Sequence, residues 1–161
     1  MLDPLDELIR RVQAALSDDL RRPPWRGAAD PLAGHCYVAS EALYHLLGGA
    51  RSGLRPQQVE HEGASHWYLR GGSGRAYDPT AGQFRRPPPA DCEACGRGFL
   101  TAGPSRRARV VMGRVRRAPG GREAVARAAR ALPGPVRPNP GSPAPSALAA
   151  FLAGRPAPPR A

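Results

Sequence analysis

The chain of 161 residues contains no lysine and only one asparagine and one isoleucine, while arginine, alanine, glycine and proline abound. All 24 basic residues are therefore arginines, and this compositional bias means that arginine content alone does not identify a partner. No apolar run approaches the roughly 20 residues that a membrane-spanning helix needs. The first residues, MLDPLDELIRR, are acidic and amphipathic, whereas a signal peptide is basic and then apolar. We therefore expect a cytoplasmic protein that does not contact a membrane.

Cysteine is also scarce. Three cysteines are an odd number, which argues against a disulfide framework and favours reduced thiols. Cys92 and Cys95 form a single C-x-x-C motif with three interpretations: half of a zinc site, a redox pair, or part of a flexible loop. No second paired motif supplies the remaining zinc ligands. We favour the loop and expect neither a metal nor an organic cofactor.

Acidic residues are nearly absent from the last third of the chain. Residues 1–100 balance 12 arginines with 12 acidic residues, whereas residues 101–161 contain 12 arginines and only Glu123, so this part carries the formal charge of +11. Such a block favours nucleic acid or another acidic partner, or is simply a solvated tail. Few aromatic residues are near it to stack on bases. The candidate polyanion contacts are Arg106, Arg107, Arg109, Arg114, Arg116 and Arg117.

Apolar spacing predicts two helices in the first third. Residues 4–22 carry apolar residues at helical spacing, with Asp3 as a cap and two prolines after the end. Residues 25–34 are predicted as a loop. Residues 36–47 carry a second apolar stripe, and a pair of glycines closes this helix.

Strands are predicted after the second helix. Residues 57–61 form one, and the aromatic-rich runs 65–70 and 75–79 flank GGSG, a turn signal, and so form a hairpin. Residues 85–98 are expected to be irregular. Residues 108–115, ARVVMGRV, are predicted as a further strand.

Composition changes after residue 117. Residues 118–161 are dominated by proline, alanine, glycine and arginine and contain too little apolar surface to offset chain entropy. We therefore expect a folded α+β domain at residues 1–117 and a largely disordered tail at 118–161, in which 122–132 and 146–152 can form short helices.

Three chemically matched residues follow one another in these elements. Cys36 begins the second helix, where the helix dipole and the free amide groups favour a thiolate. His66 and Asp78 lie on the two strands of the hairpin. A thiol, an imidazole and a carboxylate in this order are typical of a nucleophile, its base and the group that orients the base. The alternatives are a core cysteine, a core histidine and a turn aspartate.

The hairpin provides a test of this hypothesis. If His66 opposes Asp78 directly, their side chains share a face at a Cβ separation of about 5 Å. This register needs a three- or five-residue loop, whereas a four-residue GGSG loop places Asp78 on the opposite face. Catalysis therefore predicts a loop with an odd number of residues, unless a bulge or a strand end re-aims Asp78.

The segments GHCYVASEALYHLL, SHWYLR and YDPTAGQF resemble the core of papain-like cysteine enzymes in the transglutaminase-like branch. In that family, a cysteine on a helix is followed by a histidine on a strand and by a strand that ends in aspartate. The resemblance covers residues 30–84 and implies that Cys36, His66 and Asp78 are nucleophile, base and orienting residue. It also implies a papain-like core, with the nucleophile-bearing helix packed on a small antiparallel sheet. Residues 98–111 further resemble small phage and bacterial proteins.

The chain departs from papain in one respect, because no glutamine shortly precedes Cys36 to bind an oxyanion. The Cys36 amide, which Gly34 leaves open to close approach, therefore needs a second donor. The candidates for this donor or for the cleft wall are His35, Trp25, Gln83 and Tyr68.

Together these observations predict a cysteine hydrolase, a peptidase or amidase, that cleaves a peptide, protein or other amide through a thioester acyl-enzyme. Acyl transfer to an amine stays open, although nothing marks a site for a second substrate. The alternative is a non-catalytic binding protein that uses its basic last third to hold nucleic acid or an acidic partner. We expect a monomer in either case.

Overall fold

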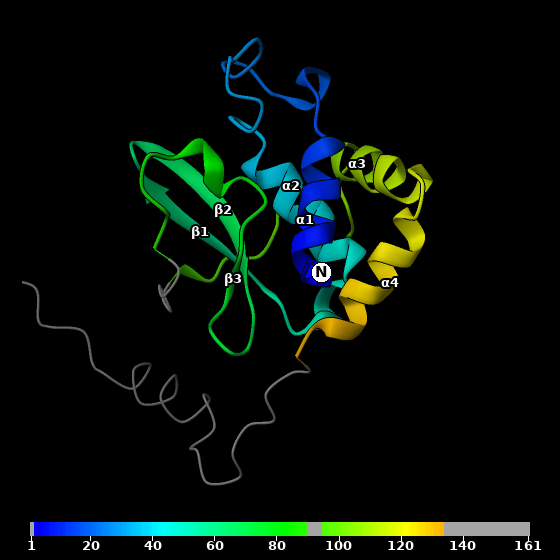
Figure 1. Cartoon of the computed structure of the whole chain (residues 1–161). Coiled ribbons are helices and arrows are strands. Elements are labelled where there is room, and N and C mark those ends of the chain that lie inside the picture. Colours follow the sequence, from blue (N-terminus) through cyan, green and yellow to red (C-terminus); the bar gives the residue numbers. More distant parts are fainter. Residues whose placement is uncertain (1, 90–94, 134–161) are drawn as a thin grey trace, which may run out of the picture.

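The computed structural model describes residues 2–89 and 95–133, and within these ranges four α-helices lie beside one three-stranded antiparallel sheet (Figure 1). This arrangement confirms the α+β class. The strands follow the order β1-β2-β3. The elements are α1 (Pro4–Ala14), η1 (Asp18–Leu20), α2 (Cys36–Leu46), η2 (Gly49–Ser52), β1 (Arg55–His61), β2 (Ala64–Arg70), β3 (Ala76–Tyr77), η3 (Ala81–Gln83), α3 (Arg106–Arg117) and α4 (Gly121–Ala131).

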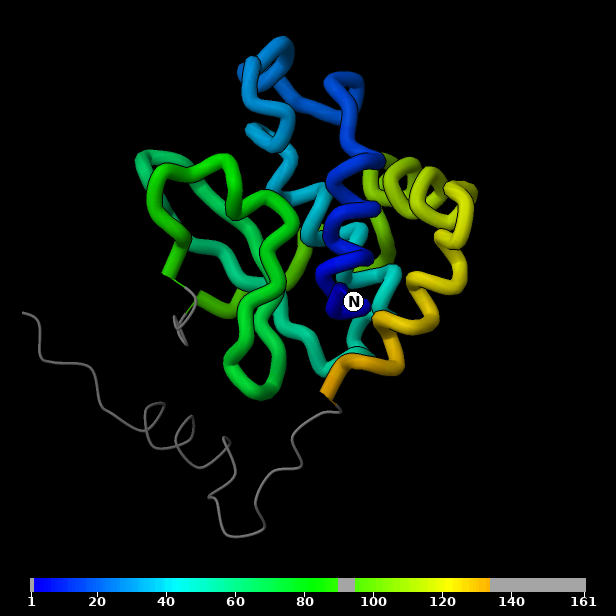
Figure 2. The backbone as a smooth tube through the Cα atoms, viewed as in Figure 1, coloured from blue at the N-terminus to red at the C-terminus, as the bar shows by residue number. Residues whose placement is uncertain are grey.

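Helix α2 is the centre of the molecule, between the sheet and the other helices (Figure 2). It packs against β2 on one side and against α1 and α3 on the other. Its apolar residues Val38, Ala39, Leu43 and Leu46 are buried, which fixes the helix and therefore the direction of its first residue, Cys36.

Helix α1 is shorter than the sequence predicts. It begins as expected, because the Asp3 side chain accepts a hydrogen bond from the Leu5 amide, but it ends at Ala14 rather than at residue 22. The carboxylate of Asp18 instead accepts hydrogen bonds from Arg21 and from the Gly27 amide. Aspartate competes with helical hydrogen bonds in this way, so the chain turns here into the loop that leads to Cys36.

The predicted strand at residues 108–115 is wrong, because this segment lies in the middle of helix α3. Its buried residues are Ala108, Val111, Met112 and Val115, and their spacing of three and four residues is helical. The side chain of Ser105 caps the helix by accepting a hydrogen bond from the Ala108 amide.

The folded region extends past residue 117. Helix α4 confirms the short helix expected at residues 122–132, and it packs against α1 and α3 with Ala124 and Ala128 buried. The boundary expected at residue 117 is therefore too early. The helix expected at 146–152 lies outside the described residues.

The β2–β3 hairpin pairs Leu69 with Tyr77 and Arg70 with Ala76, which leaves five residues, 71–75, in the loop. The predicted odd loop is thus confirmed, and the predicted direct opposition of His66 and Asp78 is wrong. In this register, the position across from Asp78 is Tyr68. His66 and Asp78 are therefore diagonal neighbours on one face, and the strand ends at Tyr77 just before Asp78.

Candidate active site

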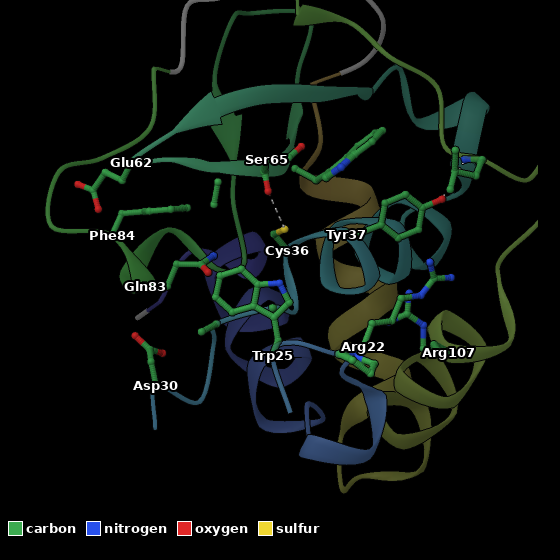
Figure 3. Close-up of a pocket in the computed structure, with 16 residues that line it drawn as sticks. Arg22, Trp25, Asp30, Cys36, Tyr37, Glu62, Ser65, Gln83, Phe84 and Arg107 are labelled. Atoms are coloured by element: carbon green, nitrogen blue, oxygen red, sulfur yellow. Dashed lines mark hydrogen bonds between the residues drawn. The ribbon is translucent and has the colours of Figure 1, made fainter. Parts of the chain in front are cut away.

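Cys36 is the first residue of α2 and carries a free thiol that borders an open pocket. The amides in the first turn of a helix have no intrahelical acceptor, so the Cys36 N–H is available to a ligand. The thiol donates a weak hydrogen bond to the backbone carbonyl of Ser65, with an Sγ–O distance of 3.7 Å (Figure 3).

His66 lies in the middle of β2 with its side chain fully buried. Its Nε2 is 2.6 Å from Oδ2 of Asp78. Its Nδ1 makes no hydrogen bond of ordinary geometry, although the Cys36 thiol is near enough to affect the ring. Phe84 packs edge-on against the imidazole, at 4.6 Å between ring centroids, and Tyr68 stacks on it at 6.2 Å. The ring is thus held between the thiol and the carboxylate.

Asp78 follows β3 directly and uses both carboxylate oxygens. Oδ2 faces His66, and Oδ1 accepts the Thr80 amide at 2.9 Å, with the Thr80 hydroxyl at 3.4 Å. The turn after the strand therefore fixes the carboxylate, and the carboxylate fixes the imidazole.

The charge state of His66 follows from these neighbours. Burial alone lowers the pKa of His66, but the hydrogen bond with the Asp78 carboxylate, its negative charge and the proximity of the Cys36 side chain outweigh burial and raise the pKa to about 9. At neutral pH the ring is therefore an imidazolium. A positively charged ring therefore lies beside the Cys36 thiol.

The pocket in front of Cys36 has a volume of about 490 Å³. Aromatic side chains form much of its wall, and charged side chains lie at its edges (Figure 3). The residues that line the pocket include Arg22, Trp25, Asp30, Cys36, Tyr37, Glu62, Gln83, Phe84 and Arg107. His66 is not among the lining residues, so the imidazole lies behind the thiol and the substrate side of Cys36 stays open.

The structure separates the four candidates for the oxyanion donor or the cleft wall. Trp25 and Gln83 line the pocket, and the Gln83 side chain donates to the Thr80 carbonyl at 3.0 Å, which leaves it a second hydrogen. His35 and Tyr68 do not line it. Both are fully buried, and the Tyr68 hydroxyl donates to the Pro89 carbonyl at 2.9 Å. The fold directs these two side chains into the interior, so their expected place at the cleft is wrong.

His35 is unusual because both of its ring nitrogens are buried and neither has a hydrogen-bond partner among the described residues. Burial, together with the positive charges of Arg21 and Arg107, lowers the pKa of His35 to about 4. The ring is therefore neutral at physiological pH.

The six candidate polyanion contacts lie on α3 and divide into two groups. Arg107 and Arg114 are half-buried and donate to the backbone carbonyls of Leu20 and Ala15. These two arginines tie α3 to the end of α1 and to η1. The exposed group consists of Arg106, Arg109, Arg116 and Arg117.

The C-x-x-C motif falls partly outside the described residues, which include Cys95 but not Cys92. Cys95 is disulfide-bonded, which differs from the reduced thiols expected from the sequence. Across residues 2–89 and 95–133, no group of three or more His, Cys, Asp or Glu side chains could hold a metal ion.

Two positioning residues were missed by the sequence analysis. Arg21 is buried and donates hydrogen bonds to the carbonyls of Ala28, Asp30 and Ala33, so it shapes the loop before Cys36. Glu41 is fully buried on α2. It accepts hydrogen bonds from the Ser105 amide at 2.9 Å and from the Ser105 hydroxyl at 2.6 Å, which joins α2 to the start of α3. A charged residue on an apolar helix face is the one available hint.

No family model, curated protein or solved structure matches this chain. In the described part of the chain, none of the helices has the length and apolar character needed to cross a membrane.

Proposed function

We propose that the chain is a cysteine hydrolase, a peptidase or amidase, in which Cys36 is the nucleophile, His66 the acid and base, and Asp78 the orienting residue. One observation carries the proposal: a buried imidazole lies 2.6 Å from a carboxylate through Nε2 and is close enough to a pocket-lining thiol for that thiol to affect its pKa. The helix-borne thiol packed on an antiparallel sheet supports a papain-like core. A monomer in the cytoplasm remains part of the same proposal.

The reaction begins with the thiolate of Cys36. Sγ attacks the carbonyl carbon of a bound amide, a C–S bond forms, and the oxygen becomes an oxyanion. The Cys36 amide and a side-chain donor from Trp25 or Gln83 stabilise that charge. When the C–N bond breaks, the imidazolium of His66 gives its proton to the leaving amine, and a thioester remains.

Water completes the cycle. His66, now neutral, takes a proton from a water molecule whose oxygen attacks the thioester carbonyl. The C–S bond breaks, the carboxylic acid product leaves, and Cys36 and His66 return to the thiolate and imidazolium pair. The net reaction is amide plus water to acid plus amine. An amine in place of water would give acyl transfer, but no described residue marks a second-substrate site.

Alkylation of Cys36 tests the ion pair. The full chain is treated with iodoacetamide between about pH 5 and pH 10, and the modified Cys36 peptide is quantified by mass spectrometry. We expect rapid reaction at neutral pH that His66→Ala reduces to the behaviour of an ordinary thiol. His61→Gln is the matched control, because His61 contacts the Arg86 carbonyl outside the triad. Identical profiles for the wild type and His66→Ala would contradict the proposal.

Acylation tests the nucleophile directly. We expect p-nitrophenyl acetate to release a burst of nitrophenolate and to leave an acetyl group on Cys36, which intact-mass and peptide analysis detect after an acid quench. Cys36→Ser and His66→Ala should both lose the adduct. A burst that persists without acetylated Cys36 would place the chemistry elsewhere.

A second proposal, polyanion binding, is favoured by the exposed arginines of α3, which form no ion pair with any described residue: Arg106, Arg109, Arg116 and Arg117. Free guanidinium groups suit phosphate oxygens. We expect the affinity for a labelled oligonucleotide to fall with salt and to weaken in the double variant Arg109→Gln/Arg116→Gln, but not in Arg51→Gln.

The length of the chain used in this measurement matters. A chain that ends at residue 117 lacks α4 and its packing on α1, so its loss of binding would be uninterpretable. A chain that ends at residue 133 keeps all four helices and removes only the last arginines. Because the proposed contacts lie on α3, this shorter chain should still bind, and binding that the double variant leaves unchanged would contradict the proposal.

A further inference from the structure

Two arginines, Arg22 and Arg107, lie together on one side of the pocket (Figure 3). Arg107 donates through Nη1 to the Leu20 carbonyl at 2.8 Å, which holds its guanidinium in place and leaves the other N–H groups free. Burial lowers the pKa of Arg107 and the nearby charge of Arg22 lowers it further, while Glu41, which is hydrogen-bonded to Ser105, opposes this only in part. Neither arginine forms an ion pair with a carboxylate among the described residues.

The position of Arg107 in α3 adds to this unbalanced charge. It lies in the first turn of the helix, where the dipole disfavours cations, and this turn contains Arg106 and no acidic residue. The guanidinium group of Arg107 at the helix start, with that of Arg22 beside it, is therefore unfavourable for stability in the absence of a ligand. An anion bound between Arg22 and Arg107 would make this arrangement favourable.

The carboxylates near the pocket are already engaged elsewhere. Glu62 accepts the backbone amides of Arg85 and Arg86, and Asp30 accepts the Leu32 amide. Figure 3 places both acids across Cys36 from the two arginines. The pocket therefore has one side with free positive charge and another whose negative charge is already hydrogen-bonded.

We infer that Arg22 and Arg107 bind a carboxylate of the substrate, so that the amide presented to Cys36 belongs to an acidic peptide or to an N-acyl amino acid. This inference rests on the proposed hydrolase function and names its substrate class. A guanidinium fork matches the two oxygens of a carboxylate, and the ring of Tyr37 lines the wall beside it. An acidic side chain and a free carboxyl terminus both supply this chemistry.

The charge preference of Cys36 alkylation tests the site without a known substrate. Iodoacetate carries a carboxylate and iodoacetamide does not, while both lose iodide as Sγ forms a bond to carbon. We expect the ratio of their rate constants to fall about three- to tenfold in Arg22→Gln/Arg107→Gln. Arg107→Lys should retain most of the ratio, and high salt should reduce it in the wild type.

The matched control is Arg122→Gln, which removes an exposed charge of α4 that does not line the pocket. An equal fall in this control would mean that net charge alone sets the ratio, and this result would overturn the inference. Because Arg107→Gln removes the hydrogen bond to Leu20, the single variant Arg22→Gln is measured too. The Arg22 side chain makes no hydrogen bond to the backbone within the described residues, so its replacement leaves the fold in place. A ratio that is unchanged in both Arg22→Gln and Arg22→Gln/Arg107→Gln would also overturn the inference.

Measuring at about pH 9.5 separates this test from the proposed function, because an ordinary thiol is then ionised as well. If Cys36 fails to react at neutral pH but the ratio at high pH still depends on the arginines, the hydrolase proposal fails and the anion site stands. If Cys36 reacts at neutral pH and the ratio does not depend on the arginines, the anion site fails and the hydrolase proposal stands.

Protection experiments distinguish the two sources of the carboxylate. N-acetylglycine carries only a terminal carboxylate, and N-acetyl-aspartate α-amide carries only a side-chain carboxylate. We expect at least one of them to slow iodoacetamide alkylation of Cys36, whereas the neutral N-acetylglycinamide should not. Equal protection by all three, or by none, would overturn the assignment.

Discussion

The substitution Asp78→Asn tests why the orienting residue is a carboxylate. The native side chain satisfies two donors at once, the His66 Nε2–H through Oδ2 and the Thr80 amide through Oδ1. Asparagine has one oxygen and can accept from only one of them, while its NH₂ group repels the other. We therefore expect the variant either to release the imidazole or to release the turn after β3.

The size of the effect follows from the charge on Asp78. Burial opposes the imidazolium, yet the pKa of His66 is raised to about 9, chiefly by the hydrogen bond to Asp78 and secondarily by Cys36. The interval from 6.5 to about 9 corresponds to about 3 kcal/mol in favour of the charged ring. Without the carboxylate, burial dominates, and we expect His66 to titrate at or below 6.5 and Cys36 to lose its reactivity at neutral pH.

Stability has a defined pH dependence. Because the pKa of His66 in the folded chain lies above the unfolded value, its contribution is complete below about pH 6.5 and is lost as the pH rises from 6.5 through 9. Urea unfolding should therefore show Asp78→Asn to be less stable than the wild type by about 3 kcal/mol at pH 6, with a smaller difference at pH 9.5.

Proton NMR of the four histidines gives the decisive measurement. The His66 resonance, assigned from His66→Gln, should titrate near pH 9 in the wild type and below 7 in Asp78→Asn. Asp30→Asn is the control, because Asp30 lines the pocket and its carboxylate accepts the Leu32 amide rather than a group of the triad. A wild-type His66 that titrates at 6.5, or a titration that Asp78→Asn leaves unchanged, would refute the reasoning.

Three further predictions concern the frame around the site. Gly34 has φ +74°, and an added Cβ would overlap the Trp25 side chain, so Gly34→Ala should lower the free energy of unfolding by about 1–3 kcal/mol and change the Trp25 fluorescence; unchanged values of both would contradict this. Glu41→Leu should lower stability by about 2–3 kcal/mol in urea, because the half-buried Ser105 amide loses its acceptor, and an unaltered midpoint would count against that link. Because the pKa of His35 in the folded chain lies below the unfolded value, its contribution to stability is complete above about pH 6.5 and is lost as the pH falls from 6.5 through about 4. His35→Leu should therefore gain up to about 3 kcal/mol on the wild type between pH 7 and pH 4, and equal acid sensitivity in the two chains would exclude this role.

Much of the fold around the site could be predicted because local signals agree with one another there. The apolar period of α2, its glycine end and the turn signal of the hairpin each specify one element and do not depend on distant contacts. The odd loop between β2 and β3 also followed from chemistry, since only that parity puts His66 and Asp78 on one face. Direct opposition did not follow, because a shift by one diagonal step keeps the same face and turn signals do not distinguish the two.

Helix α3 shows where local signals conflict. Val110 and Val111 favour a strand by intrinsic preference, but the burial of Val111, Met112 and Val115 follows the helical period. The contact that settles the conflict is the Ser105 cap, whose own amide is held by Glu41, 64 residues earlier. A pairing at this separation leaves no periodic trace in the sequence, so the choice between the helical period and the strand preference of the two valines could not be made from local signals alone.

The ends of secondary-structure elements position two of the three residues of the candidate triad. Cys36 opens a helix, so its amide is free for an oxyanion because helix geometry leaves it without a partner. Asp78 follows the last residue of β3, so its carboxylate can cap the turn at Thr80 and still reach His66. His66 lies inside β2, and the strand holds the ring in place so that it can contact Asp78 through Nε2 and, in the proposed mechanism, exchange a proton with Cys36. A shift of either end by one residue would turn the thiol or the carboxylate away from a ring that cannot follow, which is why the boundaries of α2 and β3 matter more to the proposed chemistry than the length of either element.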